Sequence, residues 1–284
     1  MAKPLSRRER RQQEKRARMA AKNPDRVSVT EALGLAGQLY DKGELAQAAG
    51  ICKSVAKAAP KHFNAQQFHG ILSAEMGRLE TVFAAFEAAA KIKPDDPGIH
   101  FNLANAFDEM GRWEDAENEF LRAHELEPHD SGTLINLGTV QRKLGRLDTA
   151  IENFEAAVSL NDGSALARGN LGHAYFELGD NDKAAACFTD AIALAPTIVE
   201  YQFGLVDALL SAGDFGATET ACLKIIDTNA DNAKAFNQLG KIFQRAGPAR
   251  RIGREVRARR GACSGRSRNA HRPWCRSAHT RADN

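Results

Sequence analysis

Three asparagines recur at a constant spacing in the middle of the chain, and they are the side chains best suited to bind another molecule. Asn102, Asn136 and Asn170 lie 34 residues apart, each directly before a leucine and a small residue. A carboxamide offers two N–H donors and a carbonyl acceptor. A row of such groups can therefore pair with successive peptide groups of an extended chain, whatever its side chains are.

Other polar residues continue this pattern. Gln238 takes the place of the asparagine near the end of the chain, where Gly34, Phe68 and Gly204 take it elsewhere. One helical turn after the row come Asn105, His173, Asp207 and Lys241. Acids follow a little further along: Asp41, Glu75, Asp108, Glu109 and Glu177. These acids are either solvated helix ends or a surface that favours a basic or neutral partner.

Residue patterns for catalysis are missing. The sequence has no GxxxxGK[ST], GxSxG or HExxH motif, and no GxGxxG between a strand and a helix. Its eight histidines are scattered, and Cys263, His271 and Cys275 have a spacing poorly suited to zinc. We expect a protein that is not an enzyme and that needs neither cofactor nor metal.

A repeat of 34 residues organises the chain that carries the asparagines. Its clearest sign is a row of seven glycines at an unbroken step of 34: Gly43, Gly77, Gly111, Gly145, Gly179, Gly213 and Gly247. A row of leucines followed by small residues has the same step, and so has a row in which a small residue precedes a bulky one by four positions. That spacing marks one stripe of a helix. Each unit therefore predicts two helices joined by a glycine turn.

This unit resembles the tetratricopeptide repeat (TPR), whose pattern is W-x2-L-G-x2-Y, then A-x3-F, then P. FNLANAFDEMGRWEDAENEFLRAHELEP, in the third unit, shows the match well. The resemblance covers units 29–62, 63–96, 97–130, 131–164, 165–198 and 199–232, and a partial unit 233–247. It implies an all-α, right-handed solenoid in which stacked helix pairs bury one continuous core. Cys52 and Cys222 take the bulky position, and we interpret them as small core residues.

In the TPR family the first helix of each unit lines a concave groove, so the resemblance implies that the asparagine row faces a ligand. It is similar to the asparagine ladder in the TPR arm of O-linked N-acetylglucosamine transferase, which holds peptide backbone. The alternative is that asparagine is simply common at this position of the repeat and serves local contacts. We expect peptide contacts at Asn102, Asn136, Asn170, Asn105, His173 and Gln238.

The net charge of +3 is the sum of unlike parts. Residues 1–28 hold ten Lys or Arg against three acids, residues 248–284 hold eleven against two, and the body between them holds eighteen against thirty-one. The basic ends allow contact with nucleic acid or an anionic surface, or they are solvated, disordered arms. The basic start resembles bacterial proteins whose TPR arrays precede a glycosyltransferase or sulfotransferase domain.

Residues 248–284 depart from the repeat in the middle of a helix pair. We interpret this arginine-rich segment as out-of-frame translation or truncation of a longer repeat protein, and a disordered basic tail is the alternative. The natural chain would then continue with more repeats, and it could carry a catalytic domain for which this array recruits substrates.

The compartment follows from the cysteines and the N-terminus. Five cysteines, an odd number without a CxxC pair, fit a reducing environment. The first residues lack a signal-peptide core, and no run of 18 apolar residues occurs. We expect a cytoplasmic scaffold that binds a protein or peptide segment, with nucleic acid an unlikely partner.

Overall fold

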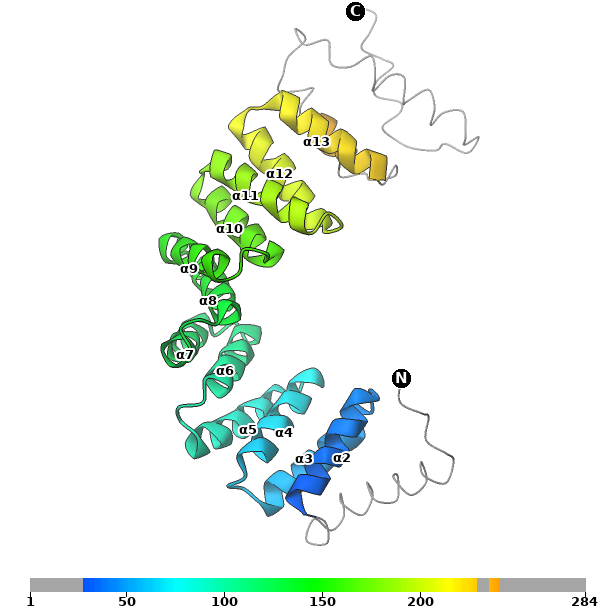
Figure 1. Ribbon diagram of the computed structural model, residues 1–284, viewed down its shortest axis with the longest axis vertical. Helices are drawn as coiled ribbons and strands as arrows, with labels where there is room; N and C mark the ends of the chain where they lie inside the picture. Colours follow the sequence, from blue (N-terminus) through cyan, green and yellow to red (C-terminus); the bar gives the residue numbers. More distant parts are fainter. Residues whose placement is uncertain (1–27, 229–234, 241–284) are drawn as a thin grey trace, which may run out of the picture. The chain divides into compact units, whose positions relative to one another are not determined.

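The computed structural model describes residues 28–228 and 235–240, and all regular structure in these ranges is α-helical. Six helix pairs follow one another along the chain (Figure 1). The first helices are α2 (Val29–Asp41), α4 (Phe63–Glu75), α6 (Pro97–Glu109), α8 (Ser131–Lys143), α10 (Ala165–Leu178) and α12 (Val199–Ala212). The second helices are α3 (Leu45–Ala58), α5 (Leu79–Ile92), α7 (Trp113–Leu126), α9 (Leu147–Leu160), α11 (Asn181–Leu194) and α13 (Phe215–Thr228).

The basic arm and the arginine-rich tail lie outside the described residues, so the expectations of disorder and of a reading-frame change are not tested. The same holds for Lys241, Cys263, His271 and Cys275. The chain divides into two compact units, one ending at Ala208 and the other beginning at Leu209. Each unit is described by itself.

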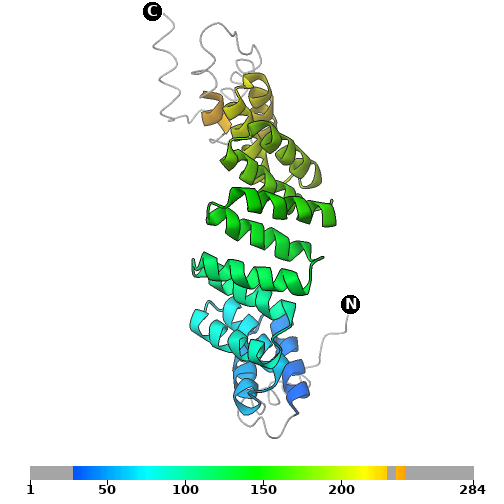
Figure 2. The same ribbon diagram turned by 90° about the vertical axis from the view of Figure 1, so that its left-hand side faces the viewer.

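In the first unit successive helices pack against one another along the chain. The two helices of a pair are in contact, and α3, α5, α7 and α9 each pack on the first helix of the next pair. The first helices also touch across pairs, α4 on α6 and α8 on α10. Figure 2 shows the middle helices lying side by side. The expected all-α architecture of stacked helix pairs is confirmed.

Glycine closes the turn between the helices of each pair. Gly43, Gly77 and their counterparts at every step of 34 up to Gly213 have φ between 65° and 90°. This left-handed region is costly for any residue with a Cβ. Glycine therefore recurs every 34 residues because the turn between the two helices of a pair needs a positive φ.

The core depends on a bulky ring lying directly on a helix that has no side chain at that point. Phe86 on α5 lies over Gly70 on α4, and Phe154 on α9 lies over Gly138 on α8 in the same way. The phenylalanine row is buried, as are Cys52 and Cys222, which confirms their interpretation as core residues. Burial raises the pKa of the Cys52 thiol to about 12, so this thiol stays protonated and unreactive.

Polar side chains cap the starts of the first helices. Residues 28, 62, 96, 130 and 164 form another row with a step of 34, and each accepts a hydrogen bond from a backbone N–H of the helix that follows: Ser28, His62, Asp96, Asp130 and Ser164. Ser28 and Glu31 form a reciprocal capping box. These caps satisfy N–H groups that a helix start leaves unpaired.

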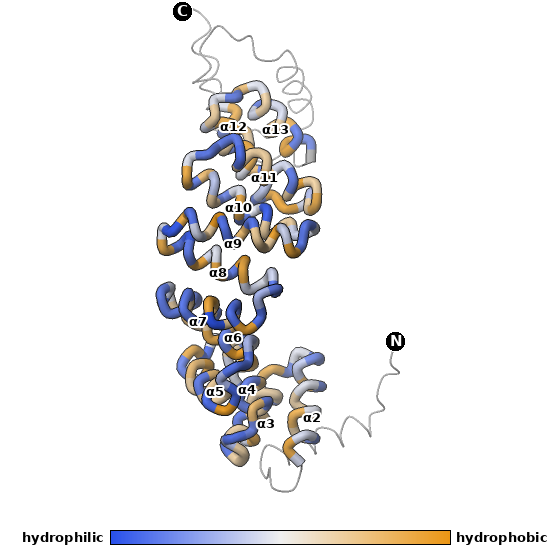
Figure 3. Tube along the Cα trace, turned by 60° about the vertical axis from the view of Figure 1, so that its left-hand side comes forward, coloured by the Kyte–Doolittle hydropathy of each residue, from blue (hydrophilic) through white to orange (hydrophobic). Residues whose placement is uncertain are grey.

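The second unit contains the end of α12, helix α13 and the helical residues 235–240. Within it Cys222 and Ile225 of α13 are buried, and the Asp214 carboxylate accepts a hydrogen bond from the N–H of Ala217. Throughout the described chain, polar and apolar residues alternate along each helix (Figure 3). None of the described helices has the length and apolar character that a membrane crossing needs.

The contact between Phe86 and Gly70 gives a first testable prediction. A Cβ at residue 70 would lie 2.3 Å from Cε1 of Phe86, and this phenylalanine is buried, with only 2% of its surface exposed. We expect Gly70→Ala to lower the free energy of unfolding by about 1–3 kcal/mol. Urea unfolding followed by circular dichroism measures the change.

Gly50→Ala is the matched control, because Gly50 also lies inside a helix but has no atom within 4 Å of a Cβ placed there. We expect this variant to gain up to about 1 kcal/mol from helix propensity. Equal midpoints for the two variants would contradict the packing argument.

Candidate peptide-binding face

The sequence-derived asparagines occupy equivalent places on three first helices. Asn102 and Asn105 lie on α6, Asn136 on α8 and Asn170 on α10, and all four are half-buried. We call the side of α6, α8 and α10 that carries these four residues and Thr139 the amide face. Each of these residues is partly exposed to solvent.

Two of the amides donate hydrogen bonds to polar side chains of the preceding first helix. Nδ2 of Asn136 donates to Oδ1 of Asn105 over 3.1 Å, and Nδ2 of Asn170 donates to Oγ1 of Thr139 over 3.3 Å. Oγ1 of Thr139 in turn donates to the carbonyl of Ile135. Both pairs join residues 31 apart, so the same contact recurs from one helix to the next.

Asn102 differs from its two counterparts. Within the described residues no hydrogen bond engages its side chain, and the position 31 residues earlier is Ile71, which has no polar atom to offer. The row therefore contains one amide without a protein partner and two that are oriented by a neighbour. Sequence reasoning missed Thr139, although a spacing of 31, three less than the repeat, indicates which residues face each other across adjacent helices.

The remaining sequence-derived site residues have different surroundings. The His173 ring packs edge-on against Phe188 with centroids 4.9 Å apart, and Nε2 lies 3.5 Å from Oε1 of Glu200, too poorly aligned for a hydrogen bond. Burial, and secondly Arg142, lower the pKa of His173. Gln238, in the second unit, is 4% exposed. We therefore do not include Gln238 among the proposed contacts.

Ion pairs link the carboxyl ends of the first helices. The Lys143 ammonium on α8 lies 2.6 Å from Asp108 on α6, and the Arg142 guanidinium on the same helix pairs with Glu177 on α10. These partners are 35 residues apart, as are Tyr40 and Glu75, whose hydroxyl and carboxylate are 3.4 Å apart. Asp108 and Glu177 are thus already neutralised by α8, which weakens the interpretation of this edge as an acidic surface.

A buried polar network joins the third and fourth helix pairs. The Glu117 carboxylate on α7 accepts a hydrogen bond from Gln141 on α8 at 3.2 Å and forms an ion pair with Arg146. Gln141 accepts one from Asn153 on α9 at 2.7 Å. Because every member of this network has a partner, it holds α8 firmly between its neighbours.

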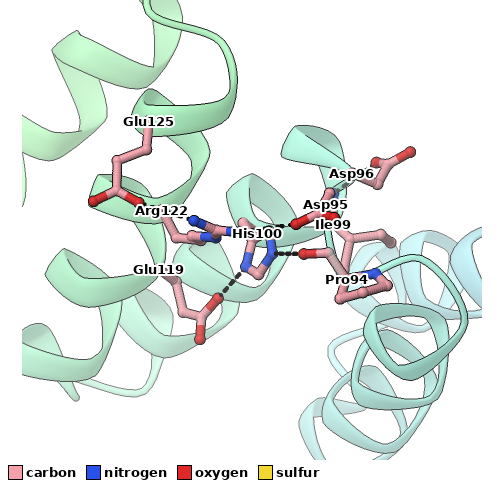
Figure 4. A network of polar contacts seen from close by, with 8 residues as sticks. All are labelled: Pro94, Asp95, Asp96, Ile99, His100, Glu119, Arg122 and Glu125. Atoms are coloured by element: carbon pink, nitrogen blue, oxygen red, sulfur yellow. Dashed lines mark hydrogen bonds and ion pairs between the residues drawn. The ribbon is translucent and has the colours of Figure 1, made fainter.

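A second polar network lies where α5 passes into α6 (Figure 4). The His100 ring bonds to Glu119 on α7 and to the carbonyl of Pro94. Arg122 on α7 reaches Asp95 in the same connection and Glu125 on its own helix. His100 is therefore engaged between helices and is not a candidate ligand contact.

The site offers hydrogen-bonding groups and no reactive constellation. In the described ranges no three His, Cys, Asp or Glu side chains lie close enough together to hold a metal ion. Burial, and secondly Asp190, raise the pKa of the Cys187 thiol to about 11, so this thiol is a poor nucleophile. What the amide face can do is donate and accept hydrogen bonds.

Comparison with family models gives three overlapping matches, all to models described as "Tetratricopeptide repeat". They cover residues 73–134, 130–197 and 170–233, so together they run without a gap over more than half of the chain. Comparison with curated protein sequences gives no match.

Solved structures of repeat proteins share the fold. PilF of Pseudomonas aeruginosa has a TM-score of 0.63 at 14% identity, over 75% of this chain and 97% of PilF. A tetratricopeptide repeat protein of Parabacteroides merdae has a TM-score of 0.63 at 20% identity, over 76% of this chain and 85% of its own. YrrB, described as having an unusual peptide-binding site, has a TM-score of 0.55 at 20% identity, over 65% of this chain and 96% of its own.

The buried network predicts a strong effect of removing Glu117. Glu117→Ala leaves the buried amide of Gln141 without its acceptor and Arg146 without its partner. We expect the free energy of unfolding to fall by about 2–4 kcal/mol. The control Asp115→Ala removes an exposed pair with Arg112 from the same helix and should cost less than about 1 kcal/mol. Chemical denaturation of both variants measures the difference, and equal losses would argue against the network.

Proposed function

Because this chain belongs to the tetratricopeptide repeat family, a family of protein-interaction scaffolds, we propose that it captures an extended segment of a partner protein on its amide face. The observation that carries the proposal is the recurrence of hydrogen-bonded amides on α6, α8 and α10. The contacts proposed for the partner are Asn102, Asn105, Asn136 and Asn170, with His173 at the end of the row.

After these hydrogen bonds are made, the amides still have donor and acceptor groups that a ligand could use. Asn136 uses one N–H for Asn105 and keeps a second N–H and its carbonyl oxygen. Asn170, bonded to Thr139, keeps the same two groups, and Asn102 keeps all of its groups. A peptide backbone needs one donor and one acceptor from each such side chain, which matches what remains.

The existing bonds also reduce the entropy lost on binding. A free asparagine side chain must be ordered when it pairs with a ligand, and that ordering opposes association. Asn136 and Asn170 are already oriented by a neighbour on the preceding helix. We propose that recognition is directed mainly at the backbone of the partner, because amides pair equally well with peptide groups of any sequence.

The proposed scaffold is not catalytic, and its proposed compartment is the cytoplasm. Support for the first point comes from the family, whose members are generally interaction scaffolds. Support for the second comes from Cys52, Cys187 and Cys222, which are free thiols, as expected in a reducing environment.

Site-specific photo-crosslinking in the native host tests the proposal. Leu166 is 53% exposed and lies one turn before Asn170 on α10, so a photoreactive phenylalanine placed there lies beside the amide face. We expect it to capture a partner segment, and we expect capture to be lost when Asn102, Asn136 and Asn170 are all replaced by Ala. Mass spectrometry identifies the captured segment.

Leu121, 40% exposed on the second helix α7, is the matched control position and should not capture that segment. Circular dichroism must show that the triple variant keeps its helix content. If both positions capture the segment, or if capture survives the triple substitution, the proposal that the amide face binds the partner is wrong.

The captured segment, made as a synthetic peptide, then tests backbone recognition. We expect alanine substitutions in the peptide to change its affinity little, whereas N-methylation of two central peptide bonds should weaken it about tenfold or more, since each lost hydrogen bond costs about 1 kcal/mol. Fluorescence anisotropy measures both effects. The reverse order of effects would indicate recognition through side chains.

A further inference from the structure

The interfaces between successive helix pairs of the first unit differ in the polar contacts that cross them. Between the first and second pairs, Nε2 of Gln66 on α4 donates to the carbonyl of Ala56 on α3 at 3.3 Å. The third and fourth pairs are joined by an amide hydrogen bond, an ion pair and the network around Glu117. Between the fourth and fifth pairs, the Tyr175 hydroxyl on α10 donates to Glu155 on α9 at 2.6 Å. Each of these interfaces therefore has directional bonds from helix to helix.

The interface between the second and third pairs, which we call the α5–α6 joint, lacks such bonds. Among the described residues no hydrogen bond or ion pair joins α4 or α5 to α6 or α7. Ile71 on α4 takes the place that Asn105 takes on α6, so it offers no polar atom to Asn102. Ala74, one turn further along α4, has no group that could pair with Glu109, whereas the equivalent position on α8 holds an arginine paired with α10.

Apolar contact holds the α5–α6 joint together. The ring of Phe83 on α5 packs on that of Phe107 on α6, with centroids 4.7 Å apart. These two rings occupy the positions that the hydrogen-bonded Glu117 and Gln141 occupy one unit later. Helices α5 and α6 also pack less extensively than α3 and α4, α7 and α8, or α9 and α10. Because apolar contact has no preferred direction, whereas a hydrogen bond requires alignment, helices at this joint can slide at little cost.

The connection between α5 and α6 is bound to the third pair. Its Pro94 carbonyl lies 2.8 Å from Nε2 of His100 on α6, and its Asp95 pairs with Arg122 on α7. Gln66, at the position equivalent to His100, reaches past its own connection to a carbonyl of the preceding helix, and His100 makes no such contact with α5. The boundary between the two sides of the joint therefore lies at the end of α5.

We infer that α2–α5 form one block and α6–α11 another, and that the two blocks shift against each other at the α5–α6 joint. Sliding of packed helices is a common form of such motion. The amide face lies wholly in the second block, so the shift leaves its hydrogen bonds intact and changes the position of α4 beside Asn102. This inference is independent of the proposed function.

Distances between spin labels on the full chain test the inference. Gly50 on α3, Asn118 on α7 and Ala186 on α11 are exposed and occupy the same place in alternate repeats. A nitroxide attached through a non-natural amino acid leaves the native cysteines intact, and double electron–electron resonance gives the distribution of distances. We expect a broader distribution between positions 50 and 118, which span the joint, than between positions 118 and 186, which do not.

A third pair of labels locates the motion. Ala84 on α5 and Glu152 on α9 are exposed at the same place in their repeats, and they span the α5–α6 joint but not the interface between α3 and α4. We expect their distribution to be broad as well. Equal widths for all three pairs of labels, or a narrow distribution for this pair, would overturn the inference.

Polar links added to the joint test its cause. Ile71→Asn supplies a carboxamide for Asn102, and Ala74→Arg supplies a guanidinium for Glu109, as happens at the next two interfaces. We expect the variant with both substitutions to narrow the distribution between positions 50 and 118 to near that between positions 118 and 186.

The matched control carries the same two substitutions together with Asn102→Ala and Glu109→Ala, so the new groups on α4 have no partner on α6. We expect its distribution to stay as broad as in the wild-type chain. Circular dichroism checks that both variants keep their helix content. If the linked variant and the control give the same width, missing polar links do not cause the motion and the inference is wrong.

Discussion

The structure depends on one close approach, that of a bulky ring to a helix that has no Cβ beneath it. Phe154 on α9 touches the backbone of Gly138 on α8, and Phe188 on α11 does the same with Gly172 on α10. The contact fixes how deeply the second helix of a pair settles onto the first. The second, fourth and fifth pairs share this glycine and phenylalanine, and the third pair has Ala104 and Phe120 at the same positions, so these pairs present similar surfaces to one another.

Because similar pairs stack in a similar way, residues at fixed sequence separations come together. Residues 31 apart meet in the middle of neighbouring first helices, and residues 35 apart meet near their carboxyl ends. The first separation joins Asn105 to Asn136, and the second joins Asp108 to Lys143. The same packing of successive helix pairs thus produces both the hydrogen bonds between residues 31 apart and the ion pairs between residues 35 apart.

Much of this arrangement can be predicted from sequence because it has a steric cause. A turn with positive φ requires glycine, and a ring over a helix requires a small residue beneath it, so both leave rows at the repeat spacing. Capping residues leave such a row too, from Ser28 to Ser164, but its members are chemically different and the pattern is easily overlooked.

Pairings between side chains of neighbouring repeats are harder to predict. Position 9 of the repeat, counted from residues 29, 63 and so on, holds Asn105, Thr139 and His173. Its side chain decides whether the next asparagine is bonded or not, yet no single residue type marks it. The contact of His100 with the carbonyl of Pro94 is hard to predict for the same reason: Gln66, Arg168 and Gln202 make the equivalent contact in other units, so three residue types, histidine among them, share one role.

Ion pairs in the structure weaken the expectation, drawn from net charge, that the repeat region favours a basic partner. Acids outnumber bases in the body of the chain, which by itself favours a basic partner. The structure commits several of these acids to neighbours: Asp108 to Lys143, Glu117 to Arg146 and Glu177 to Arg142. Beside these ion pairs on α6, α8 and α10 lies the amide face, whose asparagine and threonine side chains carry no charge, with His173 one turn beyond Asn170. In the proposed function, long-range attraction would raise the rate of encounter, and the uncharged amides would form the short-range hydrogen bonds with the peptide backbone of the partner.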